Sequence, residues 1–260
     1  MSLISVIIPN FNSGDKLKRL IDSIPSEGVE IIVIDDNSSE APVVPQDREV
    51  VMLSNTTGKK GAGSCRNLGL SKAKGEYVLF ADSDDYFLPD AFSIIDKYKV
   101  GKDIIYFSPQ SIVEGTDSPS KRHLYYEKLI KKQNMDMIKT RFHVPWSKLY
   151  LRSFIEKNQL QFDEVIASND VMFSAKAGVF ARTIDSTSDS IYCVTCSNNS
   201  LTKIKSKSVR RTRLNVVLDF NRFLNANNFK HCAYSMLEII YAYRDVITFK
   251  DVMRLMKGSA

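Results

Sequence analysis

Disulfide-stabilised and membrane-spanning proteins are excluded first, because the sequence has few cysteines and no long hydrophobic run. Four cysteines in 260 residues do not make a disulfide framework. Cys193 and Cys196 form a CxxC, but a zinc site would need a second pair, and the only complement is Cys232 beside His231. No apolar run approaches the roughly 18 residues of a spanning helix. We therefore expect structural, reduced cysteines and a cytoplasmic protein.

The sequence also lacks an internal repeat, a low-complexity linker and a recognisable signal segment. Its opening LISVIIP is short and has no cationic segment before it, so we expect a core strand there. The formal net charge is +6, which suits a nucleotide diphosphate, an anionic membrane or nucleic acid as a partner. The basic residues are not interleaved with aromatic stacking residues, so nucleic acid is the weakest of these hypotheses.

The first half of the sequence contains alternating strand and helix patterns, which predict an α/β fold. Helical patterns begin near Leu17 and Ala62, and Pro89 with Asp90 opens another. Strands are expected at residues 3–8, 30–34, 50–53, 77–81 and 103–107. Several of them end in acids or turn formers, which places these side chains at the edge where open α/β sheets bind ligands.

The second half gives a weaker pattern. We expect a helix over residues 123–138, a helix over 169–180 with Ser168 as its N-cap, and a strand over 191–195. From Ser206 onward the pattern is helical, with a further helix over 231–246. Its apolar face either docks on the rest of the chain or contacts an anionic membrane. The membrane alternative depends on a group of basic residues: Lys203, Lys205, Lys207, Arg210, Arg211 and Arg213.

Three carboxylates directly follow the apolar strand at 77–81: Asp82, Asp84 and Asp85. Carboxylates this close repel one another, and a cation among them relieves the repulsion. All-oxygen ligands favour a hard divalent ion, Mn²⁺ or Mg²⁺. These residues alone leave a solvated turn open as the alternative, because aspartate and serine are common turn formers.

Four separated segments together resemble the inverting glycosyltransferases of family 2, which have the GT-A fold. They are VIIPNFN, VIDDNSSE, GSCRNLGLSKAKGEYVLFADSDD, and WSKLYLRS followed by SNDVMF. The resemblance implies a Rossmann-like, mostly parallel central sheet with helices on both faces. It also implies a GT-A domain over residues 1–202, divided into a nucleotide-binding half (1–108) and an acceptor-side half (109–202). A helical C-terminal extension over 203–260 follows.

The resemblance also implies roles for individual residues. Asp170 is implied as the catalytic base, and Asp84 with Asp82 as the metal-binding DxD pair. Trp146 and Lys148 lie in the acceptor-side segment, where Trp146 is equally compatible with a core position. The residues implied to border the nucleotide are Pro9, Asn10, Asn12, Asp36, Arg66, Asn67 and Asp82.

The chain departs from the family pattern at three places. Asn169 stands where a glutamate is usual, and TTGKKG replaces the usual Glu-Asn-x-Gly. Residues 198–200 lack the arginine that is usual near the end of the domain. These changes bear on the identity of the donor more than on activity, since the DxD acids and the implied base remain.

The implied function is sugar transfer from a nucleotide sugar, a UDP-sugar, to a hydroxyl of a glycan or lipid-linked acceptor, as in surface polysaccharide synthesis. The leaving diphosphate is a good anion that a cation can stabilise, so one carboxylate suffices as the base. One alternative is an inactive nucleotide-sugar-binding scaffold, for which Asn169 is the best support. The other is a nucleotidyltransferase, which would usually open with a glycine- and arginine-rich phosphate loop that VIIPNFNSG does not provide.

Overall fold

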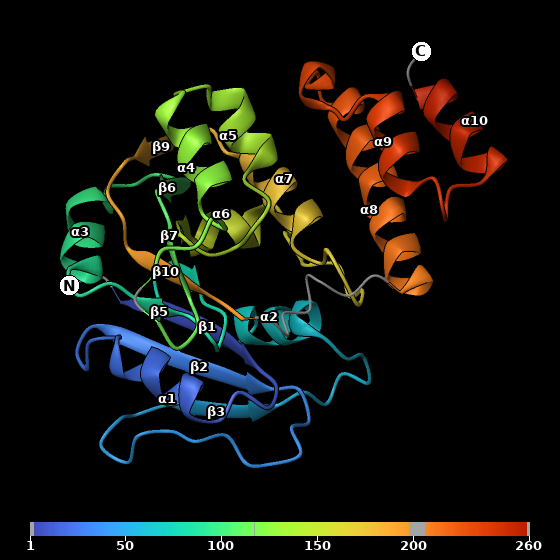
Figure 1. Ribbon diagram of the computed structural model, residues 1–260. Helices are drawn as coiled ribbons and strands as arrows, with labels where there is room; N and C mark the ends of the chain where they lie inside the picture. Colours follow the sequence, from blue (N-terminus) through green and yellow to red (C-terminus); the bar gives the residue numbers. More distant parts are fainter. Residues whose placement is uncertain (1–2, 117, 198–205, 259–260) are drawn as a thin grey trace.

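The computed structural model describes residues 3–116, 118–197 and 206–258 (Figure 1). Its main layer is a seven-stranded sheet in the order β3-β2-β1-β4-β8-β6-β9, and a second sheet has the order β5-β10-β7. The strands, in chain order, are β1 Ile4–Asn10, β2 Val29–Asp35, β3 Val51–Ser54, β4 Tyr77–Phe80, β5 Tyr86–Phe87, β6 Ile104–Phe107, β7 Gln110–Val113, β8 Lys148–Leu151, β9 Ile184–Thr187 and β10 Tyr192–Cys196.

The first half of the chain forms the parallel sheet that its sequence predicts. β1 pairs in parallel with β2 and with β4, and β2 pairs in parallel with β3. β8 is the exception, because it runs antiparallel between β4 and β6. The first strand was expected to end at Ile8, but β1 continues through Pro9 to Asn10, which pairs with Asp35 at the end of β2. The loops that follow β1 and β2 therefore start side by side.

Helices flank the main sheet (Figure 1). Leu17, Leu20 and Ile21 of α1 are buried in the main core, and α2 packs against β1 and β2. The helices are α1 Asp15–Asp22, α2 Ala62–Leu70, α3 Ala91–Tyr98, α4 Leu124–Lys131, α5 Met135–Arg141, α6 Arg152–Lys157, α7 Val171–Phe180, α8 Lys207–Ala226, α9 Met236–Tyr243 and α10 Phe249–Gly258, with a short 3-10 turn, η2, at Lys230–Cys232.

Two helix predictions are corrected by the structure. The helix expected over 123–138 is split into α4 and α5, because Gln133 has a positive φ of 49° and Asn134 then caps α5 through the Met137 N–H. Ser168 is not the N-cap of α7. It has a positive φ of 59°, and Asp170 occupies the N-cap position without a side-chain capping hydrogen bond. The carboxylate of Asp170 is therefore not used for capping.

The C-terminal helices dock on the rest of the chain through α8. Val216, Phe220 and Leu224 of α8 form a buried cluster with Met172 and Ala175 of α7. This packing confirms the docking interpretation for the apolar face of α8. The helix expected over 231–246 is shorter than predicted, because η2 and an extended segment precede α9.

The basic residues at the start of α8 are partly neutralised within the chain. Arg210 forms an ion pair with Asp245, and Arg211 forms one with the buried Asp251. Lys203, Lys205 and residues 198–200 lie outside the described residues. Within the part that the structure describes, no helix combines the length and the hydrophobicity that a membrane-spanning segment needs.

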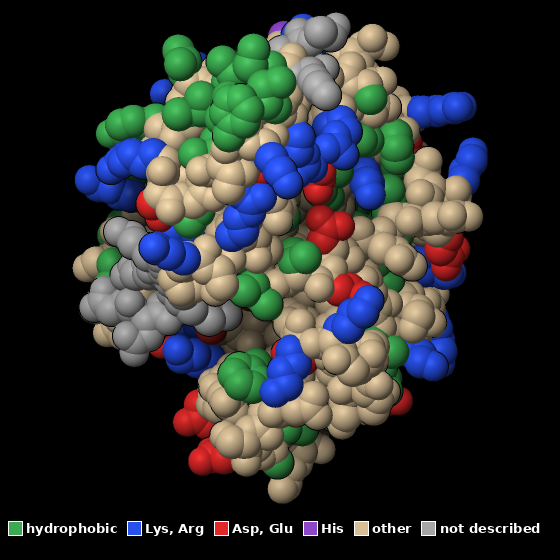
Figure 2. Space-filling view, turned by 90° about the vertical axis from the view of Figure 1, so that its right-hand side faces the viewer, with side chains coloured by type: hydrophobic (Ala, Val, Ile, Leu, Met, Phe, Trp, Pro, Cys, Tyr) green, Lys and Arg blue, Asp and Glu red, His purple; other side chains and the backbone are tan. Residues whose placement is uncertain are grey.

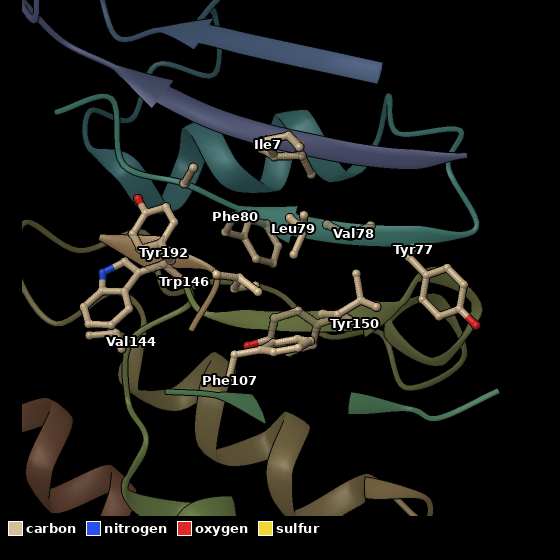
Figure 3. Close-up of a cluster of buried hydrophobic side chains, with 14 of the residues drawn as sticks. Ile7, Tyr77, Val78, Leu79, Phe80, Phe107, Val144, Trp146, Tyr150 and Tyr192 are labelled. Atoms are coloured by element: carbon tan, nitrogen blue, oxygen red, sulfur yellow. The ribbon is translucent and has the colours of Figure 1, made fainter. Parts of the chain in front are cut away.

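Aromatic side chains fill the core between β4 and the segment that carries β8 (Figure 3). The ring of Phe80 makes edge contacts with Tyr150, Phe162 and Phe173. Trp146 stacks on Tyr192 with an interplanar angle of 16°. This core joins β4, which leads into the DxD acids, to the segment that leads into Asp170.

Candidate active site

The loops after β1 and β2 are held together by hydrogen bonds between their polar side chains. The Asn10 amide donates to Asp35 at 2.8 Å, and Asn12 accepts the backbone N–H of Ser39 at 2.8 Å. Burial alone would raise the pKa of Asp35, but hydrogen bonds from Ser38 and Asn10 outweigh it and lower that pKa. Asp35 is therefore an ionised turn acid that fixes the loop.

Asp36 connects β2 to the basic loop GKKG, residues 58–61, which precedes α2. Its carboxylate accepts the Asn55 amide at 2.6 Å and the Gly61 backbone N–H at 2.7 Å. The predicted place of Asp36 at the border of the nucleotide remains a prediction.

Arg66 brings together three segments that the sequence separates widely. This α2 residue is 4% exposed and forms an ion pair with Asp82 of the DxD motif. It also donates to the side chain of Asn169 at 3.0 Å, and its guanidinium lies 5.3 Å from the centre of the Phe162 ring. The residue that replaces the usual glutamate is thus a hydrogen-bond partner of the arginine that holds the DxD motif.

Asn67, the next residue of α2, contacts the same residue, Phe162, through its side-chain amide. It donates to the Phe162 carbonyl at 3.0 Å and accepts the Phe162 N–H at 2.8 Å. Close approach here also requires Gly63, because a Cβ at that position would lie 2.2 Å from the Asp163 carbonyl oxygen. The predicted contact of Asn67 with a nucleotide stays a prediction.

The three acids of the DxD loop have different environments. Asp85 is 2% exposed, and it accepts the Tyr192 hydroxyl at 3.0 Å and the Thr195 N–H at 2.7 Å. The Tyr192 hydroxyl in turn accepts the Asp82 N–H at 2.8 Å. Burial, with the charges of its two neighbouring acids, raises the pKa of Asp85 well above its usual range. Asp85 is thus a brace that fastens the loop to β10.

We expect Tyr192→Phe to lower stability and to weaken divalent-metal binding together. The substitution removes a hydrogen-bond donor from the buried Asp85 carboxylate and the acceptor of the Asp82 N–H. An unsatisfied buried group costs about 1–3 kcal/mol, and the loop that carries the DxD acids is loosened. Thermal melting and Mn²⁺ titration measure the two effects. Tyr98→Phe is the matched control, since its hydroxyl bonds Thr187 and Asp189 away from this loop. Equal Mn²⁺ affinity in the two variants would contradict the proposed role of Tyr192 and Asp85 in holding the DxD loop against β10.

Asp82 and Asp84 are the oxygen donors that remain for a cation. The Asp84 carboxylate accepts no side-chain hydrogen bond from another residue in the described ranges. Burial raises the pKa of Asp84, and the nearby charge of Asp82 raises it further. No group of three or more candidate ligands is assembled by the described residues alone. A cation here would therefore complete its coordination with water or with oxygens of a bound diphosphate, which fits Mn²⁺ or Mg²⁺.

Asp170 directly follows Asn169, the hydrogen-bond partner of Arg66. Burial raises the pKa of Asp170, the charge of Arg66 opposes that rise, and the charge of Asp82 adds to it. Its carboxylate accepts no hydrogen bond from another residue among those described. An acid with a raised pKa and no structural partner is suited to accept a proton.

The predicted acceptor-side residues are buried rather than displayed. Trp146 is 3% exposed, and Lys148 is 1% exposed with its ammonium donating to the Phe142 carbonyl at 2.6 Å. The structure thus favours the core interpretation of Trp146 and gives Lys148 a buried position. Burial also lowers the pKa of His143 to about 3, so this histidine is neutral and does not act as a second base near neutral pH.

Sequence reasoning missed Tyr192, Asn55 and Arg19 as supports of the site. Arg19 donates to the Asp84 carbonyl at 2.5 Å and to the Thr195 hydroxyl at 2.9 Å. These residues lie in ordinary helix, strand and loop patterns. Their roles come from tertiary contacts, so no local signal could have identified them.

Together the parallel sheet, the DxD loop at its edge and the separate acid define a glycosyltransferase with the GT-A fold. Residues 5–158 match the family described as Glycosyl transferase family 2, so the chain belongs to this family. Relatives include the poly(ribitol-phosphate) beta-glucosyltransferase of Bacillus spizizenii, which is 30% identical over 73% of this chain and 31% of its own length. The poly(ribitol-phosphate) beta-N-acetylglucosaminyltransferase TarS of Staphylococcus aureus is 30% identical over 74% and 35%. The chain therefore spans about a third of the length of these relatives.

Solved structures agree with the fold. S. aureus TarS 1-349 in complex with UDP-GlcNAc superposes with a TM-score of 0.68 at 21% identity, over 98% of this chain and 79% of that one. The mannosyltransferase PcManGT of Pyrobaculum calidifontis, in complex with GDP-Man and Mn²⁺, gives 0.62 at 15% identity over 99% and 79%. At these identities the superpositions establish the fold alone.

Proposed function

We propose that this enzyme transfers a sugar from a UDP-sugar to a hydroxyl of a polyol-phosphate polymer, with inversion at the anomeric carbon. The observation that supports the proposal is Arg66, which pairs with Asp82 of the DxD motif and donates to Asn169, the residue before Asp170. The relatives' names suggest the acceptor class, since the two just described act on poly(ribitol-phosphate), and the complex of S. aureus TarS with UDP-GlcNAc suggests the donor class. A surface polysaccharide of this kind is assembled from nucleotide sugars, which agrees with a cytoplasmic enzyme.

In this mechanism, Asp170 accepts the proton of the attacking acceptor hydroxyl. Arg66 fixes Asp82 at one side of the site and Asn169 at the other, so the base and the metal-binding loop keep a constant separation. Asp84 and Asp82 would hold Mn²⁺ or Mg²⁺, which stabilises the negative charge of a leaving diphosphate. Pro9, Asn10, Asn12, Asp36 and Asn67 would border the nucleotide at the edge formed by β1 and β2.

The proposal is tested with a panel of UDP-, GDP- and dTDP-sugars in the presence of Mn²⁺. We expect a UDP-sugar to raise the melting temperature and to be hydrolysed slowly when no acceptor is present. Stabilisation without hydrolysis or transfer would favour the inactive scaffold, for which Asn169 was the sequence-based support. Failure of every UDP-sugar to bind would refute the proposed donor class.

A peripheral contact with an anionic membrane would place the enzyme beside a lipid-linked acceptor. This membrane contact is supported by the exposed apolar surface of α9 and α10. Leu237 and Tyr241 are each 75% exposed, and Phe249 is 78% exposed. Figure 2 faces this part of the molecule and shows hydrophobic side chains gathered there, with Lys and Arg side chains nearby. We expect flotation with phosphatidylserine liposomes at low salt and its loss in Leu237→Ser/Phe249→Ser. Flotation that persists in this variant would contradict the contact.

A further inference from the structure

Asn169 is held in place through its two oxygen atoms, which leaves its side-chain nitrogen available. Its Oδ1 accepts a hydrogen bond from Arg66 at 3.0 Å, and its backbone carbonyl accepts the Asp163 N–H at 3.1 Å. Because a guanidinium only donates, the amide atom that faces Arg66 must be the oxygen. The Nδ2 group makes no hydrogen bond within the described residues, and the residue is partly exposed. Asn169 therefore offers two N–H donors to a ligand.

The backbone around Asn169 fixes the direction of this side chain. Ser168 has a positive φ of 59°, which turns the chain directly before Asn169. The hydrogen bond to Asp163 closes residues 163–169 on themselves. α2 lies against this segment, because a Cβ at Gly63 would be 3.1 Å from the Asn169 Cβ. The amide is thus oriented by the fold before a ligand binds, which reduces the entropy that binding costs.

The guanidinium of Arg66 joins Asn169 to the DxD motif. Its Nη2 pairs with the carboxylate of Asp82, and its Nη1 donates to Asn169. Both nitrogens belong to one planar group, so the Asn169 amide and the Asp82 carboxylate contact the same small fork. Asn169 is also bonded covalently to Asp170. One residue therefore neighbours the DxD motif in space and the predicted base along the chain.

An inverting transfer requires the sugar to lie between those two neighbours. The diphosphate leaves on the side of the metal, and the acceptor hydroxyl attacks the opposite face of the sugar, where the base takes its proton. A residue that shares the fork of Arg66 with Asp82 and directly precedes Asp170 is thus adjacent to the transferred sugar.

The hydrogen bonds available to Asn169 differ from those of the glutamate that is usual at this position. A glutamate bonded to the arginine would still accept a proton from a sugar hydroxyl through its second oxygen. Asn169, with its oxygen bonded to Arg66, can only donate. A hydroxyl that accepts this bond still needs an acceptor for its own proton, whereas a carbonyl or carboxylate oxygen does not. The neutral amide also lacks the charge that would repel a carboxylate.

We propose that Asn169 determines donor specificity by donating a hydrogen bond to a carbonyl or carboxylate oxygen of the transferred sugar. An acetamido sugar supplies the first kind of oxygen, and a uronic acid supplies the second. The inference rests on the proposed function, because it assumes a UDP-sugar whose sugar lies between the DxD motif and Asp170. The replacement of the usual glutamate then selects the donor and does not abolish activity.

The test compares UDP, UDP-glucose, UDP-GlcNAc and UDP-glucuronic acid by calorimetry in the presence of Mn²⁺. The parent should bind UDP-GlcNAc or UDP-glucuronic acid more tightly than UDP-glucose, and the preferred donor identifies the kind of oxygen. Asn169→Asp keeps the size and the oxygen that faces Arg66 but replaces the N–H donors with a second oxygen. It should weaken binding of the preferred donor by about tenfold to a hundredfold, the range for an acceptor left unpaired. Binding of UDP, which has no sugar, should be unchanged, and Asn169→Gln, which keeps an amide, should restore part of the loss.

Asn134→Asp is the matched control, because it makes the same change at an exposed position where the side-chain oxygen keeps its bond to the Met137 N–H. It should bind all four ligands as the parent does, and melting temperatures report whether each variant folds. Three results would overturn the role of Asn169: a parent that binds UDP-glucose as tightly as both other sugars, a loss of UDP affinity in Asn169→Asp equal to that of the preferred donor, or an equal loss in Asn134→Asp. Failure of every UDP-sugar to bind the parent would instead count against the proposed donor class.

Discussion

Asp170→Asn should reduce kcat by about 10²–10⁴, the usual contribution of a general base, while leaving the affinity for the donor nearly unchanged. The substitution keeps the size of the side chain and removes its basicity. The folded structure should survive, because the Asp170 carboxylate has no hydrogen-bond partner elsewhere in the described chain and does not cap α7. Steady-state kinetics, together with donor titration and thermal melting, separate these effects.

The pH dependence of the parent enzyme provides a second measurement on the same residue. Burial raises the pKa of Asp170 above the ordinary aspartate range, although Arg66 opposes the rise. A base with a raised pKa takes up its proton at a higher pH, so the acid limb of kcat/KM should lie above the range of an exposed aspartate. This limb should disappear in Asp170→Asn.

Asp163→Asn is the matched control, since it makes the same change in the segment before α7. Its kcat should stay within a few-fold of the parent, whereas Asp170→Asn loses orders of magnitude. A drop of only a few-fold in Asp170→Asn, or an equal drop in both variants, would move the base to another residue. Glu164, which forms an ion pair with Lys59 of the loop before α2, would then be tested next.

The strands and acids around the donor site could be predicted from the sequence because their signals are local. A buried strand such as 77–81 is a continuous apolar run, and the acids follow it within a few residues. Parallel pairing then brings the ends of such strands together at one edge, which is why Asn10 and Asp35 meet as neighbours. The predicted α/β class with a mostly parallel sheet is confirmed for this reason.

The partners of those acids could not be predicted, because they are distant in the chain. Arg66 reaches Asn169 across a separation of 103 residues, and Tyr192 reaches Asp85 across 107. The burial of Lys148 was equally hidden, since a lysine in a short mixed segment is ordinarily exposed. Three neighbouring acids also look equivalent in the sequence. In the described chain, the Asp85 carboxylate is bonded to β10, whereas the Asp84 carboxylate accepts no hydrogen bond from another residue.

The distinction between Asp84 and Asp85 leads to the second large expected effect. Asp84→Ala should abolish Mn²⁺-dependent binding of a UDP-sugar. The loss of affinity should exceed the roughly 10–100-fold that removal of a supporting partner costs, because a direct ligand is lost. Stability should not fall, since the change removes one of three mutually repelling acids and breaks no side-chain hydrogen bond in the described chain.

Isothermal titration with UDP-GlcNAc, with and without Mn²⁺, measures this effect. The parent should bind Mn²⁺ more tightly as the pH rises, because burial and the charge of Asp82 raise the pKa of Asp84 and the metal must displace its proton. Asp90→Ala is the matched control, an exposed aspartate at the start of α3 that makes no side-chain cap. Mn²⁺-dependent binding should be normal in Asp90→Ala and missing in Asp84→Ala. Retention of parental Mn²⁺ dependence in Asp84→Ala would show that the DxD loop is not the metal site, and the pairing of Asp82 with Arg66 would then be purely structural.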